Sequence, residues 1–122
     1  MKSYTDLEQS KKLAEILPLE SADMFLALNG TLPVMSKYID NGLVTADDTA
    51  IPCWSLAALL NLIPKHIKEH NVLRTDIDEN TFAMWYDEIG YGVNAELPNI
   101  EMSEPVDACY EMILKLHDQK LL

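Results

Sequence analysis

Few residues of this chain have side chains that could carry out chemistry: its 122 residues include two cysteines and three histidines. Cys53 or Cys109 would act as a nucleophile if a neighbouring base such as His66 or His117 favoured the thiolate. Apolar residues surround both cysteines in the sequence, which is typical of reduced thiols that pack as small hydrophobic side chains. We therefore expect structural roles for both cysteines, and we expect no catalytic residue elsewhere.

His66 and His70 stand four positions apart. On a helix this spacing would direct both imidazoles at one metal ion, with Glu69 or a distant acid as a third ligand. Pro64 lies just before the pair and leaves a helix in this segment unsupported. Ordinary surface histidines in a polar linker are the favoured interpretation, and a metal site is the alternative.

A second pattern concerns calcium. Asp76, Asp78, Asn80 and Asp87 occupy positions 1, 3, 5 and 12 of a calcium-binding loop. Its sixth position, which needs glycine for a sharp turn, is Thr81. A hairpin turn built from ordinary turn residues is the favoured interpretation. The four glycines of the chain also form no phosphate-binding loop, so we expect no cofactor.

The charge of the chain limits its partners. The formal net charge is -11, with 20 acidic residues against 9 basic ones. Between residues 69 and 107 the acids are accompanied by one base, Arg74, which is the only arginine in the chain. Such a field repels phosphate backbones and anionic lipids, so direct nucleic-acid binding is disfavoured and a basic protein partner is permitted.

No segment suggests a membrane protein. The longest apolar run, residues 56–63, is interrupted by Asn61 and is far shorter than the roughly 20 residues of a membrane span. The N-terminus is polar and lacks the apolar centre of a secretory signal. We expect a cytoplasmic protein without membrane contact.

The first half of the chain predicts a helix and a hairpin. A capping box formed by Thr5 and Glu8 begins a helix over residues 5–17, which Pro18 ends. Strands over residues 23–28 and 32–39 flank Asn29-Gly30, a dipeptide that favours a type I′ turn. Pro33 places the second strand at a sheet edge. Residues 41–50 are predicted as a loop.

The second half repeats this order and adds a helix. A helix capped by Ser55 spans residues 55–63 and is apolar nearly all round, so we expect it to be buried on most sides. Alternation predicts antiparallel strands over residues 72–77 and 81–87. Residues 90–102 are predicted as a loop that includes one short strand, and a final helix capped by Ser103 extends to about Gln119.

These elements predict one α+β domain over residues 1–122. It consists of two helix–hairpin units and a C-terminal helix, with helices on one face of an antiparallel sheet. Three aromatic residues are the candidate partner contacts: Trp85, Tyr86 and Tyr91. Because side chains alternate along a strand, Trp85 and Tyr86 point to opposite faces, and one of the two is expected to be exposed.

Three segments, residues 13–24, 51–60 and 105–113, resemble short uncharacterised proteins of Bacteroides-type gut bacteria and their phages or mobile elements. Residues 29–49 have no counterpart in this resemblance. The group has no assigned activity, so the resemblance brings no functional residues to this chain. It implies a context only, that of an accessory protein of a gut bacterium or its mobile element.

The functional expectation follows mainly from the lack of chemical motifs. A non-enzymatic protein-interaction or accessory module is the leading hypothesis, with self-association left open. The first alternative is an acidic mimic of nucleic acid that inhibits a basic protein. The second is a small enzyme or metal-binding protein that uses Cys53 or the pair His66 and His70.

Overall fold

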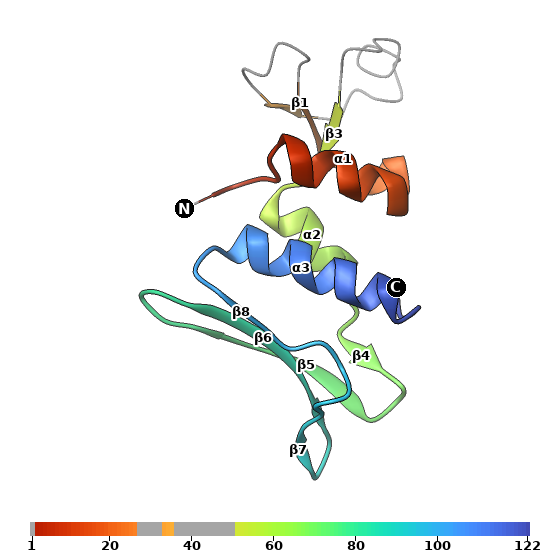
Figure 1. Ribbon diagram of the computed structural model, residues 1–122, viewed down its shortest axis with the longest axis vertical. Coiled ribbons are helices and arrows are strands. Elements are labelled where there is room, and N and C mark those ends of the chain that lie inside the picture. Colours follow the sequence, from red (N-terminus) through yellow and green to blue (C-terminus); the bar gives the residue numbers. More distant parts are fainter. Residues whose placement is uncertain (1, 27–32, 36–50) are drawn as a thin grey trace. The chain divides into compact units, whose positions relative to one another are not determined.

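The computed structural model describes residues 2–26, 33–35 and 51–122 (Figure 1). These residues form α helices and antiparallel sheets, so the α+β class is confirmed. The described strands form two sheets, whereas the sequence predicted one. Contacts divide the chain into two compact units, Ser3–Leu59 and a second unit of Leu60–Leu122 with the N-terminal end. The single domain expected from the sequence stays a prediction.

The first unit begins with helix α1, Leu7–Ile16. Its capping box is formed by Asp6 and Gln9, so the prediction of Thr5 and Glu8 was wrong by one position. Thr5, the predicted N-cap, is instead fully buried, and its Oγ1 lies 2.8 Å from Ser10 Oγ. The helix ends before Pro18, as predicted, and a 3-10 turn, Leu19–Ser21, follows.

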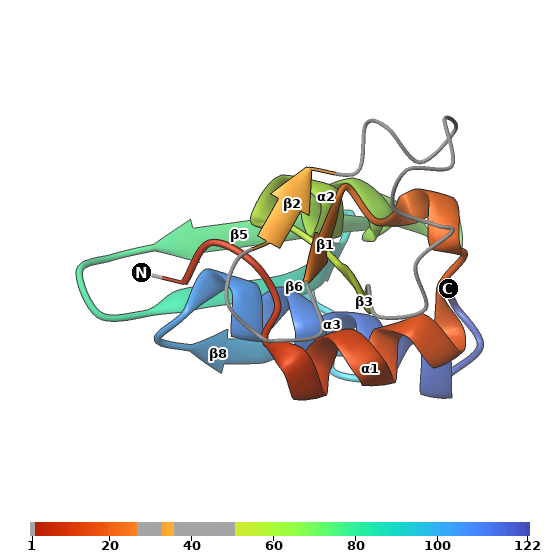
Figure 2. The same cartoon turned by 90° about the horizontal axis from the view of Figure 1, so that it is seen from above.

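The sheet of this unit has the order β2-β1-β3, and Figure 2 shows β1 between its neighbours. Strand β1, Met24–Leu26, pairs antiparallel with β2, Pro33–Met35, which confirms the pairing and the edge position of Pro33. The predicted Asn29-Gly30 turn and the loop 41–50 lie outside the described residues. Strand β3, Ile51–Cys53, was not predicted; as an edge strand it tolerates Pro52, which lacks an N–H.

Helix α2, Leu56–Leu62, follows Ser55. The Ser55 Oγ accepts a hydrogen bond from Ala58 N at 3.2 Å, so the predicted cap is confirmed. Leu59 is its one fully buried residue, Leu56, Ala58, Leu60 and Leu62 are partly buried, and Ala57 and Asn61 are exposed, so one side of the helix faces solvent.

The second unit is built on an antiparallel sheet in which β4, β5, β6 and β7 are neighbours in that order and β8 also pairs with β6. The strands are β4 His66–Ile67, β5 Asn71–Ile77, β6 Phe82–Glu88, β7 Gly92–Val93 and β8 Ile100–Met102. The predicted hairpin is confirmed as β5 and β6. The predicted loop 90–102 contains two short strands instead of one.

Helix α3, Pro105–Asp118, packs against β6 and β8 and covers one face of this sheet (Figure 1). Its N-cap is Glu104, one residue beyond the predicted Ser103. The face of β6 toward α3 carries Phe82, Met84 and Tyr86, all buried. The helix contributes a stripe of buried residues: Val106, Ala108, Cys109, Met112, Ile113 and Leu116. In the described part of the chain, no helix has the length and apolar character needed to cross a bilayer.

A tight turn that the sequence did not predict joins β4 to β5. Lys68 and Glu69 lie in the left-handed region, with φ of 52° and 64°. Residues other than glycine and asparagine rarely adopt this backbone conformation. The sequence therefore predicted a polar linker here and not a tight turn. The backbone N–H of Leu73 donates to Lys65 O at 2.9 Å and continues the pairing beyond β4.

Candidate functional site

Both cysteines are enclosed in the structure. Cys53 and Cys109 are free thiols with no exposed surface. Burial raises the pKa of Cys53 to about 12, and the charge of Asp23 acts in the same direction. Burial also raises the pKa of Cys109 to about 12, with Lys65 opposing the shift, and its Sγ lies 3.9 Å from Met84 Sδ. Protonated, enclosed thiols of this kind are poor nucleophiles.

The hydroxyl and carboxylate groups of the first unit bond to one another. Ser55 donates from its backbone N to Asp23 Oδ1 at 2.9 Å and from its Oγ to the other carboxylate oxygen. The Trp54 indole donates to Ser21 Oγ at 3.0 Å, and the Trp54 backbone N donates to Thr5 Oγ1 at 3.1 Å. These groups position β3 and the start of α2, so they support structure and do not form an open site.

The structure does not arrange the histidine and calcium patterns in the way that the two metal hypotheses required. His66 lies in β4 and His70 in the turn that follows, so the helical spacing of the metal hypothesis is not realised. Asp78 Oδ1 accepts the backbone N–H groups of Asn80 and Thr81, both at 2.8 Å. These bonds lower the pKa of Asp78 and close the β5–β6 turn. Among the residues described, no three histidine, cysteine or acidic side chains are grouped to hold a metal.

Tyr86 points into the core under α3. Its side chain has no exposed surface, and its hydroxyl donates to Pro64 O at 2.7 Å. Burial raises the pKa of Tyr86 to about 12. Because its phenol is buried and hydrogen-bonded, Tyr86 is not accessible to a partner in this structure.

Trp85 lies on the opposite, uncovered face of β6 and is half-buried. Its cross-strand neighbour is Arg74. The Trp85 Nε1 donates to Asp87 Oδ1 at 2.8 Å, and Arg74 Nε lies 3.4 Å from Asp87 Oδ2. The Asp87 carboxylate therefore holds the indole and the guanidinium on this face, in positions where both are partly accessible.

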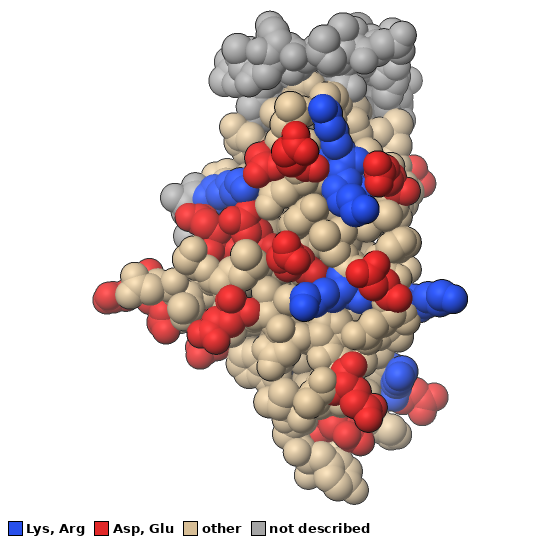
Figure 3. All heavy atoms as spheres, in the orientation of Figure 1, with Lys and Arg blue, Asp and Glu red and all other residues tan. Residues whose placement is uncertain are grey.

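Among the described residues, the most exposed aromatic residue is Tyr91, in the turn between β6 and β7. Its side chain is 83% exposed, and Ile89 and Val93 beside it are 61% and 55% exposed. We call residues 89–93 the aromatic turn. In Figure 3 this end of the unit, the lower end of the view, is free of charge at its tip and has acidic side chains above it.

Hydrogen bonds fix the backbone of the aromatic turn. Tyr91 N donates to Glu88 O at 2.9 Å, and Ile89 N donates to His70 O at 2.8 Å. Gly90 and Gly92, with φ of 87° and 84°, provide the left-handed backbone on either side of Tyr91. Sequence reasoning selected Tyr91 but missed Ile89 and Val93. The signal that could have identified these two residues was the alternation of large apolar residues with two turn glycines.

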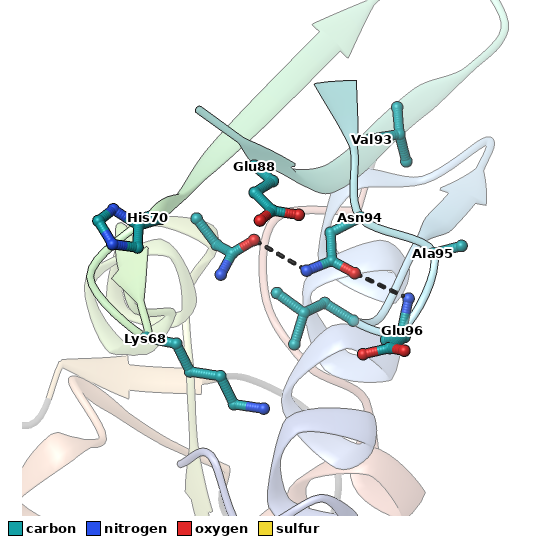
Figure 4. Close-up of a pocket in the computed structure, with 9 residues that line it drawn as sticks. Lys68, His70, Glu88, Val93, Asn94, Ala95 and Glu96 are labelled. Carbon is teal, nitrogen blue, oxygen red and sulfur yellow. Dashed lines mark hydrogen bonds between the residues drawn. The ribbon is translucent and has the colours of Figure 1, made fainter. Parts of the chain in front are cut away.

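A hollow of about 450 Å³ adjoins the aromatic turn (Figure 4). Asn71 and Leu97, both buried, form its floor. Its other lining residues come from the β4–β5 turn, the end of β6, strand β7 and the segment after it: Lys68, His70, Glu88, Val93, Asn94, Ala95 and Glu96. The lining is therefore mostly polar and carries charges of both signs.

Comparison with known proteins found no significant match to this chain among protein-family models, curated proteins or solved structures.

Proposed function

We propose that this chain is a non-enzymatic protein-binding module that contacts its partner through the aromatic turn. One observation carries the proposal: three large apolar side chains, Ile89, Tyr91 and Val93, are more than half exposed on one hydrogen-bonded turn. A soluble protein gains nothing in stability from such an exposed group, whereas tyrosine is enriched among the residues that dominate binding energies.

The rigidity of the turn supports this assignment. Association costs entropy for every loop and side chain that becomes ordered on binding. The bonds from Tyr91 N and Ile89 N fix the backbone beforehand. A partner would meet a turn whose backbone is already ordered, so less of the binding free energy is lost to ordering.

The charges near the turn indicate the chemistry of the partner. Asp87 and Glu88 precede the aromatic turn, and Glu96 follows it. Acidic groups around an apolar centre are complementary to an apolar pocket with a basic rim. We propose such a basic protein as the partner, and from the resemblance noted above we propose an accessory role in a gut bacterium or its mobile element.

The test is co-purification of the partner from a lysate of the cells that produce the protein, with mass spectrometry as the readout. Tyr91→Ser is compared with Ile77→Ser, a matched control because Ile77 is 68% exposed but lies at the far end of β5. We expect the native protein and the control to retain the partner in a high-salt wash, and Tyr91→Ser to lose it.

The opposite pattern would replace the proposal. A partner that leaves the native protein at high salt, and that Tyr91→Ser does not affect, is bound by charge alone. That result would favour the alternative, an acidic mimic of nucleic acid.

A further inference from the structure

We infer that the hollow beside the aromatic turn binds an arginine side chain of the partner. The inference rests on the proposed function and extends it, because Val93 belongs to both the turn and the hollow. A partner seated on the aromatic turn would therefore have its neighbouring side chains over this hollow.

The floor of the hollow is fixed by amide hydrogen bonds. Asn71 Nδ2 donates to Ile67 O at 3.0 Å, and Asn71 Oδ1 accepts from Asn94 Nδ2 at 2.9 Å. Asn94 Oδ1 in turn accepts from Glu96 N at 3.0 Å. The dashed lines in Figure 4 mark the two bonds of the Asn94 side chain, one of them to Glu96 N. The site is thus formed before any ligand enters.

The acidic groups of the hollow select a cation. Glu88 and Glu96 line the hollow together with Asn94, so a ligand placed over the amide would meet acidic side chains (Figure 4). Within the described residues, neither carboxylate takes part in an ion pair. An anion entering here would meet both carboxylates, whereas a cation would satisfy them.

Lys68 does not cancel this preference. The rim carries two carboxylates and one ammonium, and His70 is counted as neutral at pH 7, which leaves one negative charge. A guanidinium has five donors in one plane and can bond a carboxylate and an amide oxygen together. Arginine therefore fits the mixed lining better than the compact ammonium of lysine does.

The test is an NMR titration of the full chain with acetyl-arginine amide as the probe. Acetyl-citrulline amide, which replaces the guanidinium by a neutral urea group of similar shape, is the matched control ligand. We expect saturable shifts of the backbone amides of Asn94, Ala95 and Glu96 with the arginine probe, with a dissociation constant on the order of millimolar. Equal shifts with both probes, or no saturable shift with arginine, would overturn the inference.

Variants that neutralise one carboxylate test whether binding of the arginine probe depends on the hollow or on the general negative charge of the chain. Glu96→Gln should weaken the arginine probe about fivefold to tenfold. Glu79→Gln removes the same charge from the exposed β5–β6 turn and should leave binding unchanged. Equal weakening by both variants would show a general charge effect and contradict a site.

The inference and the proposed function can fail separately. If the arginine probe does not bind but Tyr91→Ser still abolishes partner capture, the arginine site is wrong and the binding module stands. If the probe binds but Tyr91→Ser captures the partner normally, the hollow is a cation site and the aromatic turn is not the contact.

Discussion

The two compact units use their tryptophans in opposite ways. In residues 3–59, Trp54 is fully buried, and its backbone and indole N–H groups donate to Thr5 and Ser21. In residues 60–122, Trp85 is half-buried on an uncovered sheet face and donates to Asp87. The described groups around Trp54 bond to one another, whereas Trp85 and Tyr91 of the second unit stay partly or largely accessible. Groups able to bind a partner are therefore expected in the second unit.

The largest expected difference between the units is in stability. Trp54→Ala should lower the free energy of unfolding by about 3–5 kcal/mol, because it leaves a cavity and removes both the indole contacts and their hydrogen bond. Trp85→Ala should cost about 1 kcal/mol, since less apolar surface is buried there. Urea unfolding followed by circular dichroism measures both values. Equal losses would remove the distinction between the two units.

A smaller effect tests the buried hydroxyl pair of the first unit. Thr5→Val should cost about 1–3 kcal/mol, because Trp54 N and Ser10 Oγ each lose a buried partner. Asp6→Ala removes the N-cap of α1 from an exposed position and should cost about 1 kcal/mol. If Thr5→Val cost no more than Asp6→Ala, the buried network would contribute less than its geometry indicates.

Alkaline pH should destabilise both units. Burial raises the folded-state pKa values of Cys53, Cys109 and Tyr86 to about 12, above the ordinary values of 9.0 for a cysteine and 10.0 for a tyrosine. Folding therefore keeps these groups neutral, and the benefit is complete below pH 9 and declines as the unfolded chain ionises above it. Thermal unfolding midpoints should fall between pH 9 and 11.

A thiol reagent at pH 8 should react slowly with the two cysteines until urea is added. Rapid reaction of the folded protein would contradict the burial of both cysteines.

The smallest stability effect is expected at the aromatic turn. Tyr91→Ser removes a side chain that is 83% exposed, so the free energy of unfolding should change by less than about 0.5 kcal/mol. The same urea experiment measures it. A loss above about 1 kcal/mol would mean that Tyr91 contributes to folding, and reduced partner capture by this variant would then need a structural explanation.

Local sequence patterns predicted the elements whose signals are strong. The alternation in residues 72–77 and 81–87 predicted the β5–β6 hairpin, and Pro18 marked the end of α1. Patterns failed where tertiary structure permits an unfavourable residue. Strand β3 contains Pro52 because its edge position needs no further N–H, and the β4–β5 turn places Lys68 and Glu69 at positive φ.

The candidate site was predicted in part. Alternation placed Trp85 and Tyr86 on opposite faces but did not say which face α3 covers. Phe82 and Met84 share the face of Tyr86, and this apolar set was the available indication that Tyr86 is buried. The hollow could not be predicted, because Asn71 and Asn94 meet only after β4, β5 and the segment following β7 come together.

Site-specific photo-crosslinking tests the central claim most directly. A benzophenone amino acid replaces Tyr91 in one sample and Ile77 in the other, and both are irradiated in a lysate of the producing cells. The account predicts a crosslinked product that contains the partner from position 91 and none from position 77. The same product from both positions, or a product from position 77 alone, would contradict binding through the aromatic turn.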